Sequence, residues 1–122
     1  ALNCVLTMGK GVYQTEDSDL VNEFVEQVID LGFYISIPGV VTFKNAKSLH
    51  QVVRTVDLQH LLIETDGPFL SPDPFRGKRN TPDKVIYTAQ KIADLKKVPV
   101  EVVAESTTSN AIALFNLPYV RD

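Results

Sequence analysis

A chain of 122 residues is long enough for one compact domain with a hydrophobic core. Its hydrophobic content of 44% and charged content of 22% are those of a globular protein, which excludes disordered and collagen-like chains. A net charge of −3 excludes general attraction to nucleic acid, so any such contact requires a local basic patch.

Apolar runs and cysteine content indicate where the protein acts. No apolar run approaches the roughly 18–20 residues of a membrane-spanning helix, so we expect no membrane association. Cys4 is the only cysteine, which rules out an internal disulfide and favours a reducing, cytoplasmic location. The chain starts at Ala1 without an initiator methionine or the basic region of a signal peptide. We therefore expect it to begin inside a fold, through processing or as a piece of a longer protein.

Strands and helices alternate in the first half of the chain. The apolar runs that predict strands are residues 2–8, 32–37 and 60–65. Between them, residues 20–29 and 46–56 carry apolar side chains at helical spacing, and Asn45 is expected to cap the second helix. Strand centres roughly 28–30 residues apart, separated by helices, are typical of a parallel sheet.

After Asp66 the pattern changes. Residues 67–82 contain four prolines and two glycines and predict a long, ordered loop. Thr81 is expected to cap a helix with Pro82 at its first position. Residues 100–107 and 109–117 predict two further short helices, and no fourth strand is evident.

The three predicted strands are too few to close a barrel. They leave open sheet edges that must be covered, and a (β/α)8 barrel takes about 250 residues. The pattern therefore fits either a small open α/β structure or the last part of a barrel.

Two carboxylates follow the third predicted strand. Ligands bind at the carboxyl ends of parallel strands, and Glu64 and Asp66, two residues apart, can face one site there. A carboxylate in this place can bind a divalent metal or accept a proton from metal-bound water. The alternative is that Asp66-Gly67-Pro68 is a turn in which Asp66 bonds local amides. The short spacing alone favours the turn.

The loop that follows is basic. Its cations are Arg76, Lys78 and Arg79, flanked by Phe69 and Phe75. Arginine can grip a phosphate with two parallel hydrogen bonds, and Asn80 can add another. Taken alone, a solvated basic loop is the more common explanation. Beside a carboxylate, however, the loop suits phosphodiester hydrolysis. That reaction needs acidic side chains to bind a metal and basic side chains to bind the phosphate.

The remaining polar residues carry less weight. We expect His50 and His60 to be surface or packing residues, and Cys4 to be a small buried one. Lys10 and Lys44 follow the first two strands, at the correct end for a site, but most such lysines are simply solvated.

Two stretches resemble the carboxyl-terminal part of the TatD-family metal-dependent deoxyribonucleases: "GFYISIPGVVTFKNAKSLHQVVRTVDLQHLLIETDGPFLSPDPFRGKRNTP" and "VAESTTSNAIALFNL". The likeness runs from about Gly32 to Leu117 and implies an amidohydrolase-type (β/α)8 barrel that cleaves DNA with divalent metals. The fold class is then α/β: a parallel βαβαβ unit plus terminal helices, the last three strands of a TIM-type barrel, incomplete as an isolated chain. Residues 1–122 form one domain, in which residues 1–31 are atypical.

The resemblance implies roles for individual residues. Asp66 corresponds to the last-strand aspartate, a metal ligand placed to orient or deprotonate the attacking water. Glu64 corresponds to its neighbour, which supports the ligand. Arg76, Lys78 and Asn80 correspond to the loop beside the substrate, for which we infer phosphate contacts. The implied cofactor is Zn, Mn or Mg, and the implied substrate is DNA.

Other family ligands have no counterpart in this sequence. These are a His-x-His pair, a metal-bridging glutamate and a middle-strand histidine. A further histidine aligns with Asn3, and asparagine is a poor ligand for a transition metal. Catalytic zinc sites take about three protein ligands plus water, so one ligand is too few for an active centre. With one ligand, the isolated chain is expected to be able to exist without a bound metal.

Two functions follow. The first is a portion of a TatD-like hydrolase, inactive without the missing amino-terminal strands. The alternative is a non-catalytic, truncated or degenerate α/β domain that acts as an anion-binding or interaction module. In both cases we expect the missing amino-terminal half or a second copy to cover the sheet edges.

Overall fold

The sheet is parallel and has three strands in the part of the chain that the computed structural model describes, residues 4–7, 18–65 and 67–118. The strands are β1 (Cys4–Thr7), β2 (Phe33–Ile37) and β3 (Leu61–Ile63), and they lie in the order β1-β2-β3. Val5 lies opposite Tyr34, and Ile35 lies opposite Leu61. Chain order and spatial order therefore coincide, and the predicted βαβαβ unit is confirmed.

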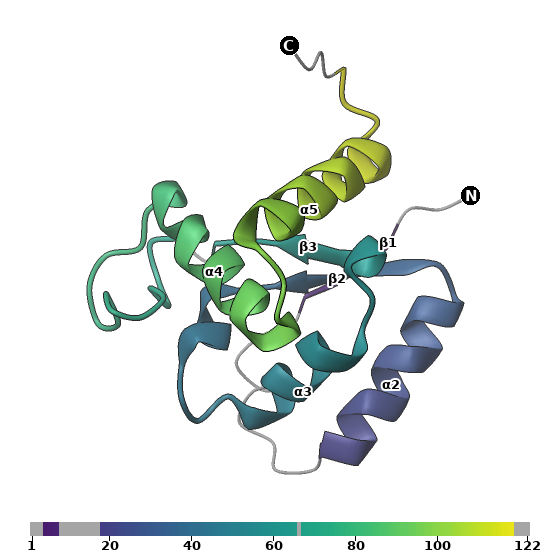
Figure 1. The fold of residues 1–122 in the computed structure, drawn as a ribbon, viewed down its shortest axis with the longest axis horizontal. Helices are drawn as coiled ribbons and strands as arrows, with labels where there is room; N and C mark the ends of the chain where they lie inside the picture. Colours follow the sequence, from purple (N-terminus) through teal and green to yellow (C-terminus); the bar gives the residue numbers. More distant parts are fainter. Residues whose placement is uncertain (1–3, 8–17, 66, 119–122) are drawn as a thin grey trace.

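The helices are α2 (Ser18–Asp30), α3 (Lys47–Thr55), α4 (Val85–Lys96) and α5 (Val100–Phe115). Short 3-10 turns are η1 (Gly39–Thr42), η2 (Leu58–His60) and η3 (Pro82–Lys84). Figure 1 shows α2 beside α3, while α4 and α5 pack against each other near β3. Among these described helices, none is both long and apolar enough to cross a bilayer.

The core lies between the sheet and the helices. On the strands, Ile35, Ile37 and Leu61 are fully buried. The predicted stripe of the second helix supplies Leu49 and Val52 from α3, as helical periodicity requires. These side chains form one cluster with the apolar residues of η1 and α4, which brings η1 tightly onto the end of the sheet.

The prediction of two short helices near the carboxyl terminus was wrong, because residues 100–115 form the single helix α5. No glycine or proline interrupts this stretch. Thr107, at the expected break, is buried and donates its hydroxyl to the carbonyl of Val103, 2.9 Å away. Asn110 donates to the carbonyls of Leu58 and Leu61, both at 2.8 Å, which holds the middle of the helix against β3.

Two helix starts also differ in detail from the prediction. Ala46, and not Asn45, occupies the N-cap position of α3, and no side chain caps that helix. Thr81 and Pro82 do start a helical segment, but its first turn is the 3-10 turn η3. The Thr81 hydroxyl donates to the Asp83 carboxylate and makes no cap bond to the backbone.

Candidate functional site

The candidate site lies where β2 and β3 end. Because these strands are parallel, η1 and the segment after β3 meet at one edge of the sheet. The Glu64 amide donates to the carbonyl of Ile37 at 3.0 Å, which fixes Glu64 at this edge with a half-buried side chain. Asp66 lies outside the described residues, so its role as catalytic residue and metal ligand stays a prediction.

Residues 67–81, which we call the strand-end loop, are braced by their own hydrogen bonds. The Asn80 backbone amide donates to the carbonyl of Pro68 at 2.9 Å, and its side-chain Nδ2 donates to the carbonyl of Phe69 at 2.9 Å. The Ser71 hydroxyl donates to the carbonyl of Lys78 at 2.8 Å. These bonds join the outgoing and returning arms of the loop, which fits the predicted ordered loop.

The strand-end loop is also fastened to η1. The Thr42 hydroxyl accepts from the Asp73 amide at 2.7 Å and donates to the carbonyl of Gly39 at 2.8 Å. A methyl group on Gly39 would lie only 3.2 Å from the Leu70 carbonyl oxygen and from a ring carbon of Pro72. A side chain at this position would push the two segments apart by a few tenths of an ångström, so glycine favours their close approach.

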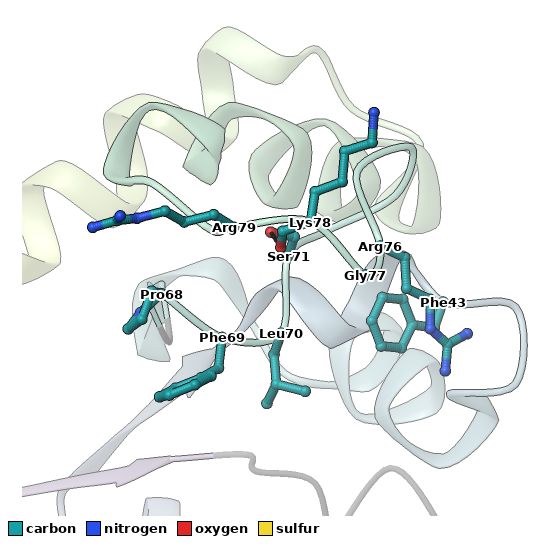
Figure 2. Close-up of a pocket in the computed structure, with 9 residues that line it drawn as sticks. All are labelled: Phe43, Pro68, Phe69, Leu70, Ser71, Arg76, Gly77, Lys78 and Arg79. Atoms are coloured by element: carbon teal, nitrogen blue, oxygen red, sulfur yellow. Dashed lines mark hydrogen bonds between the residues drawn. The ribbon is translucent and has the colours of Figure 1, made fainter.

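A pocket of about 540 Å³ opens in this loop. Its lining is Phe43, Pro68, Phe69, Leu70, Ser71, Arg76, Gly77, Lys78 and Arg79 (Figure 2). The Arg76 guanidinium lies over the Phe43 ring, 3.8 Å from its centroid. In Figure 2 the Lys78 side chain points away from Phe69 and Leu70.

The pocket is suited to an anion. Arg76, Lys78 and Arg79 are all exposed at its rim. A guanidinium stacked on a ring keeps its N–H edges in the plane, so Arg76 can still offer two parallel donors to a phosphate. The three cations that the sequence predicted therefore line one pocket, and in Figure 2 their side chains point in different directions from its rim.

Asn80 has a different place from the other predicted site residues. It is 3% exposed, and both of its nitrogens donate within the strand-end loop. Its Oδ1 has no partner among the described residues, but an amide oxygen is an acceptor and cannot donate to a phosphate. The contacts give Asn80 a bracing role, and its phosphate contact remains a prediction.

Neither histidine lines the pocket. His50 is buried and its Nε2 donates to the carbonyl of Val41 at 2.7 Å, which confirms a packing role. Burial is the main cause that lowers the pKa of His50. His60 ends η2, at the start of β3 and far from its carboxyl end. Lys10 and Asn3 lie outside the described residues, as does the Cys4 side chain.

The described residues do not form a metal site by themselves. Nowhere in residues 4–7, 18–65 and 67–118 do three or more His, Cys, Asp or Glu side chains gather to hold an ion.

Sequence reasoning missed Phe43. It follows η1, beyond the carboxyl end of β2. Its ring packs against the guanidinium of Arg76 from the strand-end loop. Its position after a strand end was the available signal, but the contact with Arg76 depends on the folding of two distant segments together.

Comparison with known proteins agrees with this arrangement. The family model described as TatD related DNase matches residues 20–116. The chain belongs to this TatD-related family. It is 50% identical over 95 residues to the uncharacterized metal-dependent hydrolase YabD of Bacillus subtilis, covering 78% of this chain and 37% of that protein. It is 48% identical over 103 residues to YcfH of Escherichia coli K12, also an uncharacterized metal-dependent hydrolase. That match covers 84% of this chain and 37% of YcfH.

Solved TatD structures share the fold. YjjV, a TatD homolog of Escherichia coli K12, superposes with a TM-score of 0.76 at 25% identity, over 93% of this chain and 40% of that one. A hydrolase of the TatD family from Entamoeba histolytica superposes with a TM-score of 0.71 at 19% identity. The match covers 92% of this chain and 42% of that one. This TatD-family chain thus corresponds to the last three strands of a TIM-type barrel, and it spans less than two fifths of the length of these two curated relatives.

Proposed function

We propose that this TatD-family chain forms the last three strands of a metal-dependent hydrolase that cleaves phosphodiester bonds in DNA. The observation that carries the proposal is the cationic pocket in the strand-end loop, directly after the β3 carboxylates. A phosphodiester needs cations for its oxygens and a carboxylate near the attacking water, and both residue types occur at this end of the sheet. DNA as substrate and the cytoplasm as its place of action are part of the proposal.

In this proposal the cations hold the scissile phosphate. Arg76 is the best-placed donor, because the Phe43 ring fixes its guanidinium in the pocket. Lys78 and Arg79 add exposed positive charge at the rim. Positively charged donors at such a site stabilise the charge that develops on the transferred phosphoryl group.

Asp66 supplies one metal ligand in this account, and Glu64 supports it from the end of β3. In the same account, the remaining ligands come from residues outside this chain. A divalent metal at such a site, whether Zn, Mn or Mg, polarises a phosphoryl oxygen and lowers the pKa of bound water.

The test is a nuclease assay on this chain with and without a supplied amino-terminal segment of a TatD relative, with metal added. We expect cleavage of DNA only when segment and metal are both present. Asp66→Asn should reduce it by about 100-fold or more, and Arg76→Ala by about 100-fold, as for other lost transition-state contacts. Asp94→Asn, an exposed carboxylate on α4, serves as the control and should change little.

Two results would contradict the proposal. One is cleavage that persists at the same rate in Asp66→Asn. The other is a folded complex of the chain with the amino-terminal segment that binds DNA but does not cleave it with Zn, Mn or Mg. The second result would favour the non-catalytic anion-binding module.

A further inference from the structure

A second pocket, of about 360 Å³, lies where the helices α3 and α4 end. Its lining is Arg54, Asp57, Leu58, Leu95, Lys96, Lys97 and Val98. Because η2 leads directly into β3, this pocket lies at the amino-terminal end of β3, whereas the strand-end loop follows its carboxyl end. The two pockets share no lining residue, so the second one is separate from the candidate site.

Lys96 links the two helix ends at this pocket. Its Nζ donates to the carbonyl of Val53 at 2.8 Å and to the carbonyl of Val56 at 2.5 Å. A helix C-terminus carries partial negative charge, and these bonds offset that charge at the end of α3. Burial is the main cause that lowers the pKa of Lys96, and the charge of Asp57 opposes this effect. The backbone and the one carboxylate of the lining therefore both act on Lys96.

The other two cations of this pocket, Arg54 and Lys97, are available to a ligand. Both are exposed, and among the residues that the structure describes neither forms an ion pair or a hydrogen bond through its side chain. Three cations thus line the pocket against one carboxylate, which leaves an excess of two positive charges. Cations are common near helix C-termini, so Arg54 alone carries little weight.

The backbone of Lys97 gives its charge more weight. Lys97 follows α4 in the left-handed conformation, with φ of 57° and ψ of 46°. This conformation is unfavourable for most residues with a Cβ, and glycine or asparagine is the usual choice. The chain follows that rule at two other helix ends, with Gly32 after α2 and Asn116 after α5. At the end of α4, a cation stands in the pocket lining despite an unfavourable backbone conformation.

We propose that the pocket between the ends of α3 and α4 binds a small phosphomonoester. A phosphate dianion matches the excess of two positive charges, and Arg54 can offer it two parallel donors. The apolar part of the lining, Leu58, Leu95 and Val98, suits the organic group of the ester. The inference goes beyond the proposed function, because this site needs neither a metal nor DNA.

The test is an NMR titration of the 122-residue chain at constant ionic strength and about pH 8, where a phosphomonoester carries two charges. We expect phenyl phosphate to cause saturable shifts of the backbone amides of residues 54–58 and 95–98. Phenyl sulfate carries a single charge and should bind more weakly. Inorganic phosphate should also bind more weakly, because it has no apolar group to place on the lining.

Lys97→Asn is the decisive variant, because asparagine tolerates the left-handed conformation. It should be at least as stable as the parent protein, yet bind phenyl phosphate about tenfold more weakly, as expected for a lost charged hydrogen bond. Arg54→Gln should weaken binding to a similar extent, and Lys97→Arg should retain it. Lys47→Gln removes an exposed cation at the first position of α3, outside this lining, and should bind as the parent does.

Arg76→Ala separates this pocket from the one in the strand-end loop. It should leave the shifts of residues 54–58 and 95–98 unchanged. Three outcomes would overturn the inference: no saturable shift with phenyl phosphate, shifts that are confined to the strand-end loop and vanish in Arg76→Ala, and unchanged affinity in both Lys97→Asn and Arg54→Gln. Because neither metal nor DNA enters this assay, its failure is distinct from failure of the nuclease assay.

Discussion

Thr42 is the residue that joins the two segments around the pocket. Its hydroxyl donates to the carbonyl of Gly39 in η1 and accepts from the amide of Asp73, which lies 31 positions after Thr42 in the strand-end loop. Thr42→Val keeps the shape but removes both bonds and leaves a partly buried amide without its acceptor. We expect the free energy of unfolding to fall by about 1–2 kcal/mol, measured by urea denaturation.

Thr108→Val is the matched control for Thr42, because Thr108 is exposed on α5. It should change the free energy of unfolding by less than about 0.5 kcal/mol. Equal urea midpoints for Thr42→Val and the parent protein would show that Thr42 does not hold the loop.

His50 makes the stability depend on pH. Burial lowers its pKa below the ordinary 6.5, and its Nε2 donates to the Val41 carbonyl. Between the lowered pKa and 6.5 the unfolded chain binds more protons than the folded one, so stability is full above 6.5 and falls as pH drops through this window. We expect urea midpoints to decline from pH 7 to pH 5.

His50→Gln retains a donor for Val41 but cannot titrate, so its decline over the same pH range should be smaller. His60→Gln leaves the His50 contact intact and should keep the decline of the parent protein. An identical pH profile for the parent and His50→Gln would remove His50 as the cause.

At the scale of elements, α5 gives the sharpest contrast between pattern and structure. Thr108 lies where the sequence predicted a boundary between two helices. If that boundary existed, Thr108→Pro would be tolerated. In the continuous α5, proline removes a helix hydrogen bond and clashes with the preceding turn, so we expect a loss of about 3 kcal/mol or more. Urea denaturation monitored by circular dichroism measures this. Thr108→Ala should cost little, and equal stability of the two variants would contradict a continuous helix.

The sequence was sufficient for elements that depend on local pattern. The apolar runs located β2 and β3, and the spacing of Leu49 and Val52 located α3. The continuity of α5 was not predictable in the same way. Its Thr and Ser residues have weak helix propensity, and long-range bonds from Asn110 to Leu58 and Leu61 outweigh that propensity.

The candidate site was predictable to a similar extent. The cations of the strand-end loop are adjacent in sequence, so their cluster was visible there. The contact of Arg76 with Phe43 and the burial of Asn80 depend on how the loop folds back on η1 and on itself. Such contacts follow from tertiary packing, which residue spacing does not encode.

At the scale of the whole molecule, the sheet edges determine the expected partners. Among the described strands, β1 and β3 each pair with β2 alone. Unpaired strand edges tend to bind further strands. We therefore predict that the chain self-associates, or forms a complex with an added amino-terminal segment of a TatD relative. Sedimentation velocity measures both, and a monodisperse monomer that ignores the added segment would contradict this prediction.

The central claim is that the carboxylate after β3 and the cationic pocket belong to one metal-dependent site. Titration calorimetry with Mn²⁺ tests it most directly, on the chain complexed with the amino-terminal segment. We predict that Asp66→Asn weakens metal binding at least about tenfold and that Asp94→Asn does not. Equal metal affinity in the parent complex and in Asp66→Asn would contradict the claim.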